Sequence, residues 1–105
     1  YTPISLSYYG NILRADHFLT SYEVKMKEVK EVSYIEELPA VSRKMGTGMD
    51  NLLSGTFTVD GYNDCELCLN PKNKGFIIIK TEKTTYIFSG KENQDTDTIY
   101  KEISK

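Results

Sequence analysis

The sequence is short of the residue types that build most catalytic sites. Among its 105 residues there is no tryptophan, one histidine and two cysteines. An active site needs a constellation of groups, such as a nucleophile, a base and a residue that orients the base. His17 is accompanied by no serine motif and no second histidine. We therefore expect the protein not to be an enzyme, and we interpret His17 as a surface or loop residue.

Long apolar runs and an excess of positive charge are also missing. The longest apolar run, Phe76 to Ile79, is far shorter than the roughly 20 residues that cross a bilayer as a helix. The net charge is −2, from 13 basic and 15 acidic residues. Nucleic-acid-binding domains normally carry a basic face, and adhesion to anionic lipid by charge alone needs basic clusters. The composition thus argues against both kinds of partner.

The two cysteines stand in "CELCL", as Cys65 and Cys68. A CxxC pair is typical of metal or redox sites, but zinc takes about four ligands and no second CxxC exists. The surrounding alternation indicates a strand, which puts the two thiols on opposite faces with Cα atoms roughly 10 Å apart. A disulfide needs less than about 7 Å. We expect two structural thiols, no disulfide, no metal and no cofactor.

The residues that are abundant favour strands. Eight tyrosines accompany many threonines, valines and isoleucines, all of them strand formers. A chain of this length suits one hydrophobic core, so we expect a single domain over residues 1–105. Because the first residue is Tyr1 rather than Met, we expect the chain to be a segment of a longer protein.

The first third of the chain contains one clear hairpin and one ambiguous stretch. "PISLSYYGN" alternates up to Gly10-Asn11, a turn pair, and "NILRADHF" reads as the returning strand. In "TSYEVKMKEVKEVSYIEELP" the apolar residues recur every three or four positions, as in a helix. Val24 with Met26, and Val32 with Tyr34, also alternate as in strands. The local pattern leaves both alternatives open until Pro39 ends the stretch.

The rest of the chain predicts a loop, four strands and one helix. Residues 40–53 have no clean period and are interpreted as a loop. Four strands follow as two consecutive hairpins, and "FIIIK" shows no alternation, which is typical of a strand buried on both faces. The period then changes to that of a helix within Asn93 to Lys105, with Asn93 as N-cap. Its apolar stripe is Ile99, Tyr100 and Ile103.

Within the predicted loop, "SRKMGTGM" places Arg43 and Lys44 beside Gly46 and Gly48. It is not a P-loop, because the lysine precedes the glycines and a strand follows. Our main interpretation is a long connection whose glycines supply positive φ. The alternative is a loop that contacts a ligand, as long loops on β scaffolds often do. The candidate ligand-binding residues are Arg43, Lys44, Gly46 and Gly48.

Three stretches resemble bacterial pleckstrin-homology-like (PH-like) domains: "EELPAVSRKMGTGMDNLLSGTF", "NPKNKGFIIIKTEKTTYIFS" and "KENQDTDTIYKEI". The resemblance implies a mainly β fold with one C-terminal α-helix. It implies a partly open barrel of two roughly orthogonal antiparallel sheets, capped by the helix. It also favours strands over a helix for residues 22–35.

The resemblance implies a non-enzymatic binding or interaction module whose partner is a protein, a peptide or a second copy. Relatives often follow transmembrane segments, so we expect a soluble domain with a membrane tether outside this segment. The alternative function is binding of an anionic headgroup or small ligand by residues 42–49. Phosphoinositide-binding relatives use basic residues between the first two strands, and "YYGNI" has none, which weighs against lipid.

Overall fold

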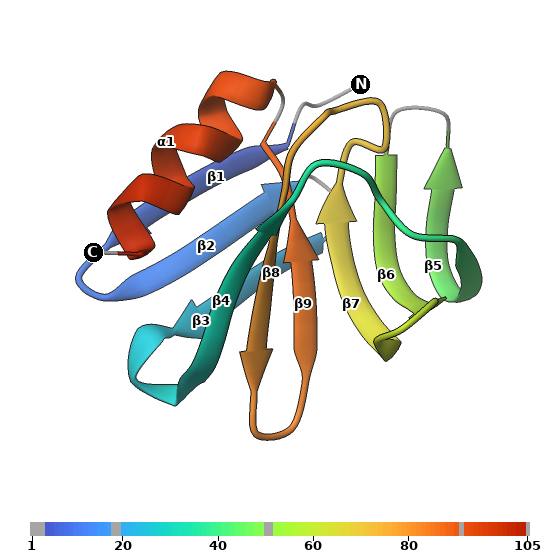
Figure 1. Ribbon diagram of the computed structural model, residues 1–105, viewed down its shortest axis with the longest axis horizontal. Helices are drawn as coiled ribbons and strands as arrows, with labels where there is room; N and C mark the ends of the chain where they lie inside the picture. Colours follow the sequence, from blue (N-terminus) through green and yellow to red (C-terminus); the bar gives the residue numbers. More distant parts are fainter. Residues whose placement is uncertain (1–3, 18–19, 50–51, 91, 105) are drawn as a thin grey trace.

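The computed structural model describes residues 4–17, 20–49, 52–90 and 92–104 (Figure 1). Within these ranges the chain forms nine strands, one 3₁₀ turn and one α-helix. In order they are β1 Ser5–Tyr9, β2 Ile12–His17, β3 Thr20–Lys25, η1 Met26–Glu28, β4 Val29–Ile35, β5 Val41–Met49, β6 Leu52–Val59, β7 Asn63–Leu69, β8 Phe76–Thr81, β9 Thr85–Phe88 and α1 Asn93–Ile103.

The strands form two sheets, one of order β1-β2-β3 and one of order β4-β8-β9-β7-β6-β5. The predicted fold class is confirmed: the protein is mainly β, its two sheets leave the barrel partly open, and its one long described helix is C-terminal. One pairing corrects the expectation of purely antiparallel sheets. β9 inserts between β8 and β7, so it runs antiparallel to β8 but parallel to β7.

The first hairpin forms as predicted. Gly10 and Asn11 have φ values of 61° and 63°, the left-handed pair that a type I′ turn requires. The turn fixes the β1–β2 register, in which Tyr9 faces Ile12 and Ser7 faces Arg14.

The ambiguous stretch is two strands, so the strand alternative is confirmed over the helix. β3 and β4 are separated by η1 alone, and the Met26 N–H donates to the Asn11 carbonyl at 2.9 Å. This bond ties the corner between the two sheets to the first hairpin. Val24 is buried between the sheets, whereas Glu23 and Lys25 on either side of it are exposed. The two-residue alternation therefore reported the strand correctly.

The prediction of a loop over residues 40–53 is wrong for residues 41–49, 52 and 53, and its residues 50 and 51 lie outside the described ranges. Val41–Met49 is β5 and Leu52 already begins β6, and their register shifts between Arg43 and Met45. A bulge adds one unpaired residue and so breaks the two-residue period. Two glycines follow it and carry no side chain to mark a face, which is why the strand shows no pattern.

The six-stranded sheet is apolar on both faces. Its inner face packs with the three-stranded sheet and α1 in one cluster that contains Ile77, Ile79 and Phe88. The opposite face forms a second cluster that contains Phe76 and Ile78. The prediction that "FIIIK" is buried on both sides is confirmed. In Figure 1 the connection from β4 to β5 crosses this second face, and its Leu38 packs there.

Helix α1 lies within the predicted range Asn93 to Lys105, but its N-cap is Glu92 rather than Asn93. Glu92 and Asp95 form a reciprocal capping box, which satisfies backbone N–H groups at the first turn. The Asn93 side chain instead accepts a bond from the Lys74 N–H at 2.7 Å. Ile99 and Ile103 are buried against the sheets, as expected. No helix in the described part of the chain is long and apolar enough to span a membrane.

Candidate functional site

The candidate residues Arg43, Lys44, Gly46 and Gly48 all lie on β5, the edge strand of the larger sheet. All four are exposed, and Met45 between them is 74% exposed. Arg43 faces Phe57 and Met45 faces Thr56 across the ladder to β6, which leaves Lys44 as the extra residue of the bulge. The structure therefore brings the four residues together along one strand, not into a phosphate-cradling loop.

The charge of Lys44 is already matched inside the protein. Its Nζ lies 2.8 Å from Asp64 Oδ2, and Thr58 Oγ1 donates to the other oxygen of the same carboxylate at 3.0 Å. Bonds from Lys44 and Thr58 lower the pKa of Asp64. Arg43 makes no ion pair with any residue that the structure describes. Of the two candidate cations, Arg43 is therefore the one available to an external anion.

The two candidate glycines have different roles. Gly46 has a φ of 124° and faces Gly55, whose φ is 123°. A Cβ on Gly46 would collide with the Ser54 carbonyl and the Gly55 backbone, so the β5–β6 contact requires glycine here. Gly48 has no positive φ, and its Cβ would meet only ordinary contacts, the nearest being Arg43 Cδ at 3.8 Å. The positive-φ interpretation holds for Gly46 and is wrong for Gly48.

The two thiols lie on opposite faces of β7, as the alternation predicted. Cys65 belongs to the second cluster and Cys68 to the cluster between the sheets, and both are free. Burial raises the pKa of Cys65 to about 11 and that of Cys68 to about 12, so both are protonated near neutral pH and unsuited to nucleophilic attack. Among the described residues, no group of three or more His, Cys, Asp or Glu is placed to hold a metal ion.

Basic residues missing from the β1–β2 turn are supplied by a neighbouring segment. Lys25 and Lys27 line a shallow pocket together with Gly10, Asn11 and Ile12. Sequence reasoning missed this grouping, because it inspected only the turn itself. The signal available was "VKMKEVK", three lysines around a short break between two possible strands.

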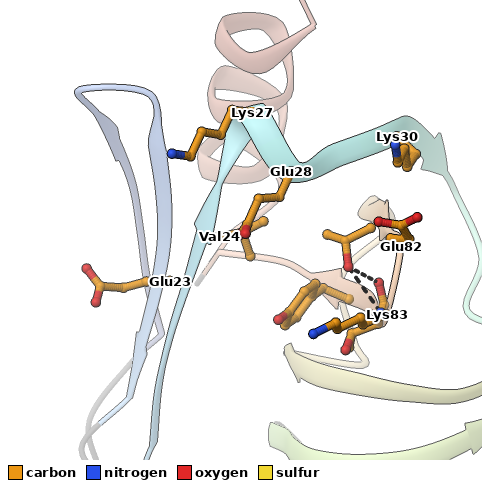
Figure 2. Close-up of a pocket in the computed structure, with 10 residues that line it drawn as sticks. Glu23, Val24, Lys27, Glu28, Lys30, Glu82 and Lys83 are labelled. Carbon is orange, nitrogen blue, oxygen red and sulfur yellow. Dashed lines mark hydrogen bonds between the residues drawn. The ribbon is translucent and has the colours of Figure 1, made fainter.

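A neighbouring cavity of about 400 Å³ lies between β3, η1 and the β8–β9 turn (Figure 2). Its charged lining residues alternate in sign: Glu23, Lys27, Glu28, Lys30, Glu82 and Lys83. Figure 2 shows Glu28 and Lys83 extending into the space between these elements. With equal numbers of acids and lysines, this cavity has no net preference for an anion.

The two sheets together have four edge strands, β1, β3, β4 and β5. Natural proteins protect exposed edges with charges, bulges and prolines. β3 carries Glu23 and Lys25, β4 carries charges and a register shift, and β5 carries Arg43, Lys44 and its bulge. β1, "SLSYY", has no charge, no bulge and no proline. It is the one edge in the described sheets without a charge, a bulge or a proline, and helix α1 packs beside it.

The outer edge of β1 presents regular hydrogen-bonding groups. The two-residue hairpin closes on the hydrogen-bonded pair Tyr9–Ile12. Because hydrogen-bonded and non-hydrogen-bonded pairs alternate along an antiparallel ladder, Leu6 and Tyr8 are in non-hydrogen-bonded pairs with β2. Their N–H and C=O groups therefore point away from β2. Between described residues, no hydrogen bond outside the β ladder uses these groups. A groove of about 440 Å³ runs beside the strand, lined by Ile4, Ser5, Leu6, Gln94, Asp95, Thr98 and Ile99.

Helix α1 forms the other wall of this groove. Its docking is reinforced by Tyr34 of β4, whose hydroxyl donates to Asp97 Oδ1 at 2.6 Å and whose ring lies 5.1 Å from that of Tyr100. The hydrogen bond to Asp97, with burial, raises the pKa of Tyr34 to about 12. The groove thus lies between a strand edge and a helix that is held by contacts from both sheets.

Comparison with known proteins agrees with this geometry. The family model described as "Bacterial PH domain" matches residues 5–102, which spans β1 through nearly all of α1. Searches of curated proteins and of solved structures found no significant match. The resemblance seen in the sequence is thereby confirmed and extended to the first hairpin, and the chain belongs to the bacterial PH domain family.

Proposed function

We propose that this domain is a non-catalytic interaction module that binds an extended segment of a protein by adding it as a strand to β1. PH-like domains are generally binding modules rather than enzymes. The observation that carries the proposal is the edge of β1, which is regular, uncharged and open beside the α1 groove. An extended partner would gain main-chain hydrogen bonds from Leu6 and Tyr8, and specificity from side chains placed in the groove.

The groove suits a partner side chain of mixed character. Leu6 and Ile99 supply apolar surface, and Asp95 is the one ionisable residue among those that line it. One oxygen of Asp95 accepts the Glu92 N–H in the capping box. A lysine or arginine of the partner could pair with the other oxygen while its aliphatic stem lies on the apolar floor.

The test is an amide chemical-shift titration with three synthetic peptides in which valine alternates with lysine, with serine or with glutamate. We expect saturable shifts at Leu6 and Tyr8, strongest with the lysine peptide because of Asp95. The control variant, Asp95→Asn, should lose the preference for lysine and retain binding. Shifts confined to Val41–Met49, or no saturable shift with any of the three peptides, would contradict the proposal.

A second candidate is an anionic headgroup or small ligand, and specific contacts bear on where it would bind. Residues 42–49 offer Arg43 alone, because Lys44 is paired with Asp64. Lys25 and Lys27 beside the β1–β2 turn offer two cations. Titration with phosphate and inositol phosphates tests both places: shifts at Arg43, Gly46 and Gly48 support the β5 site, and shifts at Lys25, Lys27 and Asn11 support the turn.

A further inference from the structure

We propose that the strand added to β1 is β1 of a second copy of this chain, antiparallel and centred on Ser7. This rests on the proposed function, since it uses the same edge, and it names the partner. The two copies would join their three-stranded sheets into one continuous sheet around a two-fold axis, the commonest symmetry of soluble homo-oligomers.

The hydrogen-bond pattern of β1 suits pairing with itself. Centring on Ser7 places Leu6 opposite Tyr8 of the second copy, and Tyr8 opposite its Leu6. Both residues direct their N–H and C=O groups to the free edge, as the register with β2 requires. Each of the two pairs exchanges two bonds, as in any antiparallel ladder. No residue of β1 is left without an opposite residue, because Ser5 meets Tyr9.

The side chains also fit this register. Ser7 is exposed and would face Ser7 of the second copy across a close, non-hydrogen-bonded pair. Leu6 and Tyr8, both half-buried at the rim of the core, would form aliphatic–aromatic cross-strand pairs, which stabilise sheets. Tyr9 is 89% exposed and would lie across from Ser5 of the second copy. The pairing therefore covers the most exposed large apolar side chain among those that the structure describes.

Charge favours a second copy over an arbitrary strand. No charged residue occurs from Ile4 to Leu13, so self-pairing brings no like charges together at the strand. α1 runs alongside β1 in the same direction (Figure 1), with Asp95 in its first turn and Lys101 in its last. A two-fold axis through Ser7 reverses the second helix, which sets Asp95 of each helix toward the last turn of the other, where Lys101 stands beside Glu102.

A five-residue strand buries little surface, so the dimer belongs to the weak, transient class of interfaces. The first experiment therefore traps it covalently through Ser7→Cys under mild oxidation. We expect an intermolecular disulfide, because the two Cβ atoms face each other across the axis. The native thiols should not interfere, since Cys65 and Cys68 are buried.

The matched control is Ser5→Cys, on the same face of the same strand. Its two copies would lie about 14 Å apart in the proposed register, so it should cross-link far more slowly. Equal cross-linking of both variants, or none with Ser7→Cys, would overturn the proposed pairing.

A second experiment uses charge at the axis. Ser7→Lys and Ser7→Glu should each be monomeric in a sedimentation-velocity concentration series in which the native chain self-associates. Mixing the two variants should restore association, because opposite charges then meet across the pair. A native chain that stays monomeric at the highest concentrations, or self-associates unchanged by either substitution, overturns the second-copy assignment. Saturable peptide shifts at Leu6 and Tyr8 would in that case leave the proposed function standing.

Discussion

The edges of β1 and β5 are both open, and they differ in nearly every property that governs strand pairing. β5 has nine residues, two cations, a bulge and a glycine with positive φ. β1 has five residues, no charge and an unbroken register. β1 also has a helix beside it, which creates a groove. The longer edge that attracts attention in the sequence is thus the one less suited to accept a strand.

Exposure alone therefore does not make a strand edge a binding edge. Charges and bulges on an edge raise the cost of adding another strand, and β5 has both. Its Gly46 serves the internal contact with β6 rather than a ligand. Regular, unprotected backbone groups beside a groove are the stronger indication, and β1 combines them.

The largest expected effect tests whether the glycines of β5 are structural. Gly46→Val adds a Cβ that collides with the Ser54 carbonyl and the Gly55 backbone, at a positive φ that valine resists. Strain and overpacking together should lower the free energy of unfolding by about 4 kcal/mol, measured by urea titration. Gly48→Ala is the matched control and should change it by less than about 1 kcal/mol, because its Cβ makes ordinary contacts. Equal losses would contradict the assignment of the two roles.

The next effect tests whether the groove formed by α1 is what makes β1, and not β5, a binding edge. Ile99→Ala leaves a cavity beneath the helix and should lower the free energy of unfolding by about 2–4 kcal/mol. It should also weaken peptide or second-copy binding at β1, because Ile99 lines the groove. A loss below about 0.5 kcal/mol, the size expected of a surface substitution, would refute the packing of α1.

A smaller effect comes from the bond that holds α1 to β4. Tyr34→Phe removes the hydrogen bond to Asp97 and should lower the free energy of unfolding by about 1 kcal/mol at neutral pH. Because the bond raises the pKa of Tyr34 from 10.0 to about 12, its contribution is fully present below pH 10 and is lost as the pH rises toward 12.

The pH dependence provides the control for this prediction. In the native chain the free energy of unfolding should fall between pH 10 and about 12, and in Tyr34→Phe this fall should be shallower. It should not vanish, since burial and Glu66 also raise the pKa of Tyr22. An unchanged slope in urea titrations across this range would show that Tyr34 does not link α1 to the sheet in solution.

The smallest effect concerns the exposed cations of β5. Arg43→Ala with Lys44→Ala should leave the free energy of unfolding nearly unchanged, because exposed ion pairs such as Lys44–Asp64 contribute little. Strand addition at β1 should be unaffected, which separates the two edges. Loss of saturable shifts with inositol phosphates in this variant, with the fold intact, would instead support the anion site on β5.

Much of the fold could be predicted, because local chemistry and burial agree in most segments. The Gly10-Asn11 turn, the doubly buried β8 and the stripe at Ile99 and Ile103 each carry an unambiguous pattern. β5 could not be predicted, since its bulge and glycines erase the alternation. The pairing of β9 with β7 could not be predicted either. Several segments have the same strand-like pattern, and a local pattern does not determine which of them become neighbours in the sheet.

The candidate site was harder to predict than the fold, because its location depends on which strand edges remain unpaired. Arg43, Lys44, Gly46 and Gly48 were chosen from their residue types, and those types do mark an exposed strand. Nothing in "SLSYY" signals that its outer edge is open, since openness is set by sheet order and by the position of α1. The absence of charge over this stretch was visible in the sequence, and it acquires meaning only once the edges are known.

Amide hydrogen exchange as a function of protein concentration tests the central claim most directly. We expect the Leu6 and Tyr8 amides to exchange rapidly in dilute protein, where they point to solvent, and to become protected as concentration rises. The amides of β5 should show no such dependence. Protection that grows on β5 while Leu6 and Tyr8 stay unprotected would contradict the account and make β5 the interaction edge.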